Sequence, residues 1–321
     1  MILILTNSKD YSTNRVIDWI SYFKQTYFRV NFEDAIISFS INLSKTELIE
    51  IEFDTGKKID FSKINSFWYR RGNFILNLFT HKNTEYSNEL IDHLNMEWET
   101  IFTYLHRKLE KSHHLGSFET EHINKIEALS IAASIDIEIP QTLISNRKGN
   151  MKKFFSKVND KCITKSISEI FSQIDDIENK ILYSIISEVR EEDFLISDNI
   201  FPTLLQERIG RQFDLRIFYL DKKCYSMAIF NTTTDDVVDI RDCLNYAKCR
   251  TVPYKIPSEL NEKICILMNK LNLNTGSLDF VVTEDNRYIF LEVNPIGQYS
   301  FLSEDCNYYI DKKIAEYLKN N

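Results

Sequence analysis

The sequence predicts a mixed α/β (α+β) protein built from two or three packed units. Its 321 residues exceed the roughly 100–200 residues of a typical single domain. The chain opens with a continuous apolar run at residues 1–6, and an amphipathic segment at residues 13–23 follows. That order is typical of a buried strand and a covering helix. The last third contains apolar runs joined by short polar turns, which indicate antiparallel hairpins.

The first unit is expected to span residues 1–115. Two β-like runs, at residues 35–41 and 49–53, precede an apolar segment that ends in Trp68-Tyr69-Arg70-Arg71. Residues 83–109 then predict a long helix, because their apolar side chains recur at helical spacing and place one face in a core. The members of that face are Leu90, Leu94, Trp98, Ile101 and Leu105.

The second unit, residues 116–203, is expected to begin with a helix at residues 121–135. Pro140 disfavours helix immediately afterwards and permits a strand. Asn150 is a candidate N-cap for a short helix. A strand over residues 162–165 ends at Lys165, and residues 181–189 form another β-rich run.

The third unit, residues 204–321, is predicted to be built mainly from hairpins. Strand-like runs at residues 215–220 and 224–230 flank a polar turn. A helix at residues 259–271 precedes a second hairpin at residues 276–294, and residues 309–318 are typical of a closing amphipathic helix.

Composition excludes several classes of function. A net charge of −8 argues against general attraction to nucleic acid or to an anionic membrane. No apolar run approaches the roughly 18 residues of a spanning helix, and the first residues lack the features of a signal peptide, so a cytoplasmic protein is expected. The seven glycines are too dispersed for Gly-x-Gly-x-x-Gly or Gly-x-x-x-x-Gly-Lys, and the six cysteines form no Cys-x-x-Cys pair.

The hairpin at residues 276–294 is the most informative segment. If its turn is symmetric about Asp285 and Asn286, Asp279 lies directly opposite Glu292. Like charges so placed destabilise a strand pair, and Asn294 adds an oxygen on the same face. Two carboxylates and an amide oxygen suit Mg²⁺. The alternative is a different register, in which both carboxylates are ordinary exposed strand residues.

Together the motifs are similar to those of the ATP-grasp ligases, and among these they resemble the graspetide maturases of the microviridin or grasp-with-spasm type. The matching segments are spread over nearly the whole chain and are weakest before Phe67 and across residues 166–199. They are Trp68-Tyr69-Arg70-Arg71, Gln206-Glu207-Arg208-Ile209, Asp214-Leu215-Arg216, Leu278-Asp279-Phe280 and the run from Phe290 to Tyr299. The resemblance implies an ATP-grasp fold, with an N-terminal α/β pre-grasp domain and two α+β subdomains that hold ATP between them.

The resemblance also implies roles for individual residues. It assigns two lysines to the nucleotide, and Gln206, Glu207 and the backbone of Ile209 to an adenine-reading hinge. It assigns two arginines to the transferring phosphate or acyl phosphate, and the hairpin oxygens to Mg²⁺. The nucleotide residues are Lys125, Lys165, Gln206, Glu207, Ile209 and Asp214; the catalytic arginines are Arg216 and Arg241; the metal ligands are Asp279, Glu292 and Asn294. Physical chemistry supports cations near the phosphates, although each lysine or arginine alone is more often a solvated or ion-paired surface residue.

Arg70 and Arg71 are expected to bind substrate carboxylates or phosphate, for which the guanidinium fork is suited. The alternative is a strand end whose arginines pair with acidic side chains of the protein itself.

The implied activity is ATP- and Mg²⁺-dependent closure of ester or amide rings in a ribosomal precursor peptide, through acyl phosphates of its Asp or Glu side chains. The expected partner is that peptide, with its leader docked on the middle unit; a homodimer is left open. Two alternatives remain: another ATP-grasp ligase that adds amino acids to a protein tail or a small molecule, and a non-catalytic peptide-binding relative.

Overall fold

The computed structural model describes residues 1–44, 47–76, 86–168, 172–175, 180–183, 186–195, 200–232 and 249–319. The chain divides into two compact units. Unit 1 comprises residues 1–121, 273–275 and 298–321, and unit 2 comprises residues 122–272 and 276–297. The last helix of the chain, which the sequence-based division assigns to the third unit, therefore lies in unit 1.

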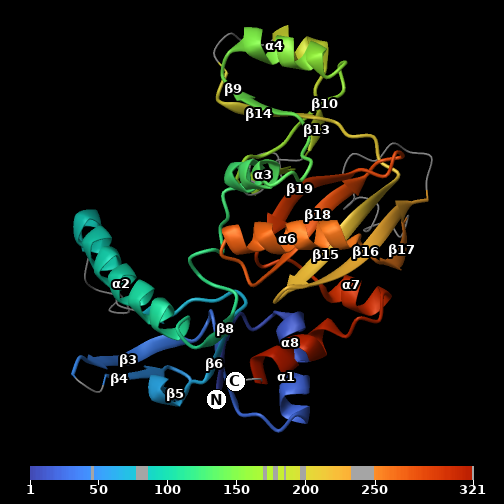
Figure 1. Cartoon of the computed structure of the whole chain (residues 1–321). Coiled ribbons are helices and arrows are strands. Elements are labelled where there is room, and N and C mark those ends of the chain that lie inside the picture. Colours follow the sequence, from blue (N-terminus) through green and yellow to red (C-terminus); the bar gives the residue numbers. More distant parts are fainter. Residues whose placement is uncertain are drawn as a thin grey trace. The chain divides into compact units, whose positions relative to one another are not determined.

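Unit 1 is built on a parallel sheet whose strand order is β2-β1-β6-β8. The apolar opening run forms β1, and every residue of that strand is buried, as a central strand of a covered parallel sheet requires. Helix α1 packs against α8, and α8 against β6 (Figure 1). The elements are β1 (Ile2–Thr6), α1 (Tyr11–Tyr22), β2 (Tyr27–Asn31), β6 (Ser66–Tyr69), β8 (His113–Leu115), α7 (Ser300–Asp305) and α8 (Ile310–Lys319).

A second four-stranded sheet of unit 1 has the order β5-β4-β3-β7, and the long helix α2 contacts it through the rings of Trp98 and Phe39. The helix begins at Asn88 after an N-cap serine, Ser87. Only its C-terminal turns are buried, whereas Leu90 is exposed and Leu94 is only partly covered. The apolar face predicted from helical spacing is thus buried only in part. The elements are β3 (Ala35–Asn42), β4 (Leu48–Phe53), β5 (Lys58–Asp60), η1 (Phe61–Lys63), β7 (Ile75–Leu76) and α2 (Asn88–Leu109).

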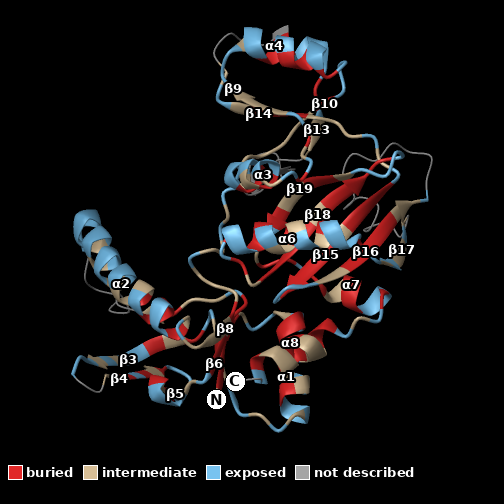
Figure 2. Ribbon diagram, viewed as in Figure 1, coloured by how far each residue is buried: buried red, intermediate tan, exposed pale blue. Residues whose placement is uncertain are grey.

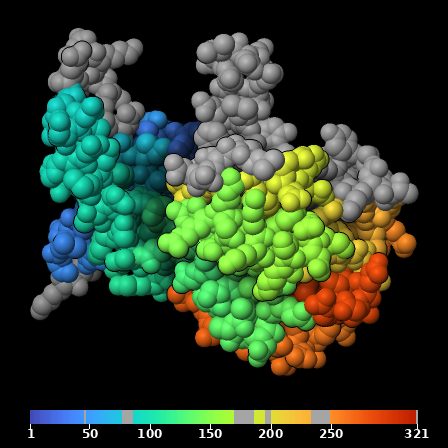
Figure 3. Space-filling view, turned by 90° about the horizontal axis from the view of Figure 1, so that it is seen from above, coloured from blue at the N-terminus to red at the C-terminus, as the bar shows by residue number. Residues whose placement is uncertain are grey.

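The first part of unit 2 is an antiparallel sheet of order β13-β10-β14-β9, covered by α4. Helix α4 begins at Lys148 after Arg147, which makes no side-chain cap bond, so the predicted N-cap at Asn150 is wrong. The outer side of α4 is exposed (Figures 2 and 3). The elements are β9 (Thr142–Ser145), α4 (Lys148–Lys157), β10 (Cys162–Thr164), β11 (Ser172–Asp175), β12 (Lys180–Tyr183), β13 (Ser187–Glu188), η2 (Glu191–Leu195) and β14 (Thr203–Glu207).

The second part of unit 2 is a five-stranded sheet of order β17-β16-β15-β18-β19. Helix α6 lies across one face of this sheet (Figure 1). Asp221 and Lys222 join β15 to β16 with positive φ at both positions, which is typical of a two-residue type I′ hairpin turn. The elements are α3 (Lys125–Ser134), β15 (Phe213–Leu220), β16 (Lys223–Asn231), β17 (Cys249–Tyr254), α6 (Ser258–Lys270), β18 (Thr275–Val282) and β19 (Tyr288–Asn294).

Within the described ranges, no helix combines the length and apolarity that a membrane crossing requires.

Candidate active site

The last hairpin, β18–β19, places Asp279 directly opposite Glu292, as the sequence predicts. The symmetric turn on which that prediction depended is wrong, because Phe280 pairs with Phe290 and Val282 with Tyr288. A bulge next to Asp279 leaves Leu291 unmatched and restores the opposition of the two carboxylates. The hairpin therefore brings two acidic side chains together at the point where its register changes.

Each of these carboxylates faces a cation. Arg216 on β15 places Nη1 2.6 Å from both carboxylate oxygens of Asp279. Lys125, the first residue of α3, has Nζ 3.5 Å from Oε2 of Glu292. The carboxylate side chains are 30% and 35% exposed, so a ligand can reach both. The site thus holds two positive and two negative groups around one strand pair.

Lys125 is positioned by local structure. Asn124 caps α3 by accepting hydrogen bonds from the N–H groups of Ile126 and Glu127. The chain that leaves this helix is joined to the hairpin by the N–H of Phe290, which donates to the carbonyl oxygen of Glu138 at 2.8 Å. Helix α3 therefore packs against β19, with its first turn near Glu292.

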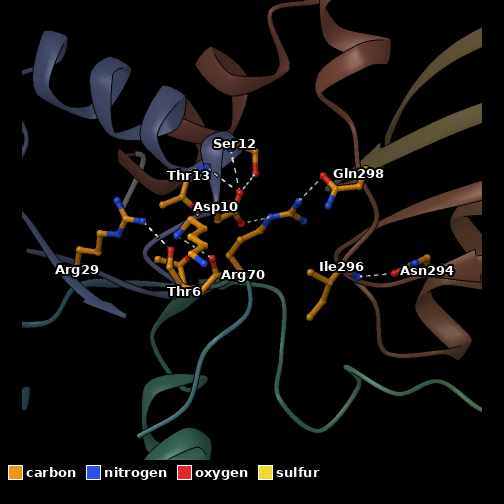
Figure 4. A network of polar contacts seen from close by, with 11 residues as sticks. Thr6, Asp10, Ser12, Thr13, Arg29, Arg70, Asn294, Ile296 and Gln298 are labelled. Atoms are coloured by element: carbon orange, nitrogen blue, oxygen red, sulfur yellow. Dashed lines mark hydrogen bonds and ion pairs between the residues drawn. The ribbon is translucent and has the colours of Figure 1, made fainter. Parts of the chain in front are cut away.

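Asn294 lies at the end of the same strand as Glu292, two residues further on. Its Oδ1 accepts a hydrogen bond from the N–H of Ile296 at 3.1 Å, which fixes the direction of the amide (Figure 4). A carbonyl oxygen has two lone pairs, so one remains for a cation. Asn294 is exposed.

These oxygens fit Mg²⁺ that is bound together with phosphates. Mg²⁺ typically takes one or two carboxylates and completes its octahedron with water and substrate phosphate oxygens. The described residues contain no group of three or more His, Cys, Asp or Glu side chains that could enclose a metal by themselves. Asp279, Glu292 and Asn294 would therefore hold a shared ion rather than a permanently caged one.

A pocket of about 230 Å³ lies in unit 2 next to the predicted metal hairpin, β18–β19, with Leu291 in its wall. Both predicted nucleotide lysines, Lys125 and Lys165, line it, and Lys165 follows the end of β10. Its size is somewhat below the roughly 300–1,000 Å³ of typical ligand pockets. The apolar walls come from Ile126, Leu129, Ile139, Ile144, Leu204 and Leu291. An apolar pocket with ammonium groups is suited to a flat base carrying phosphates.

The predicted adenine-reading segment ends strand β14 beside this pocket. Gln206 is buried and lies on the same side of the strand as Leu204; its Nε2 donates to Oγ1 of Thr142, which also lines the pocket. Glu207 instead holds the strand pair together, because its N–H donates to the carbonyl oxygen of Gln141 and its carboxylate accepts from the N–H of Gln141. Among the described residues the lining includes none of Gln206, Glu207 and Ile209.

Asp214 is not part of that lining either. Nη1 of Arg211 lies 3.1 Å from both of its carboxylate oxygens, and Asp214 is 8% exposed. Sequence reasoning missed Arg211, Thr142 and Leu291. Of these three, only Leu291 adjoins a predicted site residue, Glu292, and its spacing in the sequence does not indicate that it lines a pocket.

Arg70 does not have the setting expected of a substrate-binding residue. It is 4% exposed, and its Nε lies 3.2 Å from Oδ2 of Asp10. Its Nη2 lies 3.4 Å from Oε1 of Gln298 (Figure 4). Arg70 is thus paired with an acidic residue of the protein itself, as the alternative interpretation of this strand end expects. Arg71 is exposed, and the predicted catalytic Arg241 lies outside the described residues.

No family model and no curated protein matches this chain. Several solved structures, in contrast, are similar to it over nearly their whole length. The macrocyclase MdnC bound with precursor peptide MdnA, from Microcystis aeruginosa MRC, is 24% identical, with a TM-score of 0.81 over 100% of this chain and 99% of that one. The Chryseobacterium gregarium RiPP-associated ATP-grasp ligase in complex with ADP and a leader and core peptide is 22% identical, with a TM-score of 0.80 over 99% and 94%. The chain has the ATP-grasp fold.

A more distant ATP-grasp structure shows the same likeness over the whole chain. The ligase PsnB complexed with minimal precursor, Mg and ADP is 14% identical, with a TM-score of 0.71 over 99% of this chain and 96% of that one. The fold thus recurs at low identity, which confirms the fold class predicted from the sequence.

Proposed function

We propose that this ATP-grasp protein is an ATP- and Mg²⁺-dependent ligase that closes rings in a ribosomally made precursor peptide. The observation that carries the proposal is the direct opposition of Asp279 and Glu292 across the last hairpin, with Arg216 and Lys125 beside them. Like charges placed in this way repel each other, and Arg216 and Lys125 offset that repulsion. Binding of a divalent cation together with phosphate groups would account for two carboxylates at this position.

In this proposal the nucleotide base occupies the apolar pocket, and the phosphates extend toward the hairpin. Lys125 and Lys165 line the pocket and supply positive charge, and Thr142, which accepts a hydrogen bond from Gln206, offers a polar atom at its wall. Mg²⁺, when bound, neutralises phosphate charge and aligns the transferring group. The strands within residues 116–203 and the hairpin within residues 204–321 would act as the two nucleotide-binding subdomains.

The reaction would take place in two displacements. A carboxylate oxygen of a peptide Asp or Glu attacks the γ-phosphorus, and the bond to ADP breaks, giving an acyl phosphate. A Ser or Thr hydroxyl, or a Lys amine, of the same peptide then attacks the acyl carbon. Inorganic phosphate leaves and the attacking group loses its proton, so each ring consumes one ATP and removes the elements of water from the peptide.

The protein's part in these steps is electrostatic. Phosphoryl transfer requires mainly positioning and stabilisation of charge. Arg216 is well suited because its side chain is only 15% exposed and its guanidinium lies at the metal hairpin. Partial burial strengthens its field. We assign the same role to Arg241, and contact with a substrate carboxylate to the exposed Arg71.

The solved relatives support the choice of substrate. MdnC is a macrocyclase and was solved with its precursor peptide, and the Chryseobacterium ligase was solved with ADP and a leader and core peptide. PsnB was solved with precursor, Mg and ADP. We therefore propose a precursor peptide as partner, with a leader that docks and a core that reacts, and place the reaction in the cytoplasm.

Mass spectrometry of a candidate precursor tests this proposal. The substrate would be a short peptide rich in Thr, Ser and acidic residues that is encoded beside this protein, incubated with enzyme, ATP and Mg²⁺. The expected products lack one water per ring and appear with one ADP and one phosphate each, and the D279N variant makes none. A gain of mass would instead indicate ligation of a second molecule. Tight peptide binding with no ATP consumption would indicate a non-catalytic peptide-binding protein.

A further inference from the structure

The chain passes between the two units at residues 121–122, on both sides of residues 273–275, and at residues 297–298. Within unit 1, each crossing is held at the carboxyl end of β6 or β8. The hydroxyl of Tyr69 donates to the carboxylate of Glu121. The side-chain amide of Asn274 accepts from the N–H of Gly116 and donates to the carbonyl oxygen of His114, both at 2.9 Å. The last crossing, at residues 297–298, is held by Arg70.

Arg70 is fixed on several sides. Beside its contacts with Asp10 and Gln298, its guanidinium carbon lies 5.4 Å from the ring centroid of Tyr299, within cation–π range. Oδ1 of Asp10 accepts the N–H groups of Ser12 and Thr13 at the start of α1. A buried guanidinium is tolerated only when it is paired and hydrogen-bonded, so this arrangement constrains both the arginine and the residues it contacts.

The segment that leads to Gln298, residues 294–297, is held by hydrogen bonds and close packing. Asn294 accepts the N–H of Ile296 through its side chain and that of Gly297, at 3.1 Å, through its backbone carbonyl. A Cβ added at Gly297 would lie 2.2 Å from the side chain of Ser277 on β18, so this residue is tightly packed on the metal hairpin. Residues 294–297 are thus held by the hairpin, and the very next residue is held by Arg70 (Figure 4).

We propose that Arg70 is a positioning residue that fixes the end of the metal loop, residues 294–297, and through it the orientation of Asn294. The proposal rests on the proposed function only for the metal-binding role of Asn294. In this proposal Arg70 is a structural tether and not the substrate contact expected from the sequence. Its side chain is 5% exposed and is already surrounded by Asp10, Gln298 and Tyr299.

The double variant R70M/D10N tests the tether, because it removes the arginine without leaving a buried charge unpaired. Hydrogen exchange of the unliganded protein would follow a peptide that covers residues 294–302. Exchange at Ile296 and Gly297 is expected to accelerate about 10-fold, and Mn²⁺ affinity measured with a non-hydrolysable ATP analogue to fall about 10-fold, as for other residues that orient a metal ligand. The affinity for the precursor peptide should not change.

Two further variants separate the tether from general loss of structure. Q298A keeps the buried ion pair and removes the side-chain contacts of the exposed Gln298, and it should accelerate exchange in the same direction. R107M removes an exposed arginine that pairs with Glu119 and should change neither readout.

Unchanged exchange and unchanged Mn²⁺ affinity in folded R70M/D10N would overturn the proposal. So would weakened peptide binding with intact Mn²⁺ affinity, because that pattern belongs to a substrate contact. If the wild-type protein binds no Mn²⁺ with nucleotide, the proposed function fails, and the exchange measurement still decides whether Arg70 holds the loop.

Discussion

A histidine buried among aromatic rings should make the stability of unit 1 depend on pH. His106 in α2 is 1% exposed, and neither ring nitrogen has a hydrogen-bond partner within the described part of the chain. Phe102 is its nearest ring, at 4.3 Å between centroids. Burial lowers the pKa of His106 to about 3. The other rings around it are Phe67, Tyr69, Phe74 and Phe118.

The sign and size of the effect follow from linkage. The unfolded chain binds a proton on this histidine near pH 6.5, whereas the folded chain does so only near pH 3. Between these values protonation favours the unfolded state, so stability is lost as pH falls below about 6.5. From pH 7 to pH 5 the loss from this one group is about 2 kcal/mol.

Replacement of His106 by Phe should remove that loss and the cost of an unsatisfied buried ring. Denaturant unfolding at pH 7 and pH 5, read by circular dichroism, measures the difference. The wild type should lose about 2 kcal/mol more than H106F between the two pH values. The control H93F replaces an exposed histidine of the same helix and should follow the wild type. Equal losses in the wild type and H106F would refute the reasoning.

Three further substitutions test the site and its support. K165M should raise the KM for ATP about 10-fold or more, because a charged hydrogen-bond donor is lost, while leaving peptide affinity unchanged; an unaltered KM would remove Lys165 from the site. R71M should do the opposite, raising the KM for the precursor about 10-fold and leaving that for ATP unchanged. G116A should lower the free energy of unfolding by more than about 1–2 kcal/mol, because φ is +72° and an added Cβ would lie 2.4 Å from the carbonyl oxygen of Tyr69; a variant as stable as the wild type in denaturant would contradict that.

Local pattern was sufficient for much of the fold. The apolar run of β1, the hairpin β15–β16 and the closing helix α8 all follow from periodicity and turn residues, which act over a few positions. The opposition of Asp279 and Glu292 was predicted correctly, but from a symmetric turn that the structure does not have. The bulge beside Asp279 cannot be predicted from strand composition. The start of α4 was misplaced because no side chain caps that helix.

The contacts of Arg70 could not be predicted in the same way. Its partners, Asp10 and Gln298, are separated from it by 60 and 228 positions. Nothing local distinguishes an arginine that will be buried beside a helix N-cap from one that will face a ligand. Tertiary packing decides which arginine is buried, and the adjacent Arg71 is exposed.

Binding of a divalent cation at the last hairpin is the most direct test of the account. Electron paramagnetic resonance would follow Mn²⁺ binding in the presence of a non-hydrolysable ATP analogue, in the wild type and in D279N and E292Q. The account predicts nucleotide-dependent Mn²⁺ binding by the wild type and a loss of affinity of more than about 10-fold in each variant. Equal Mn²⁺ binding by the wild type and both folded variants would contradict it.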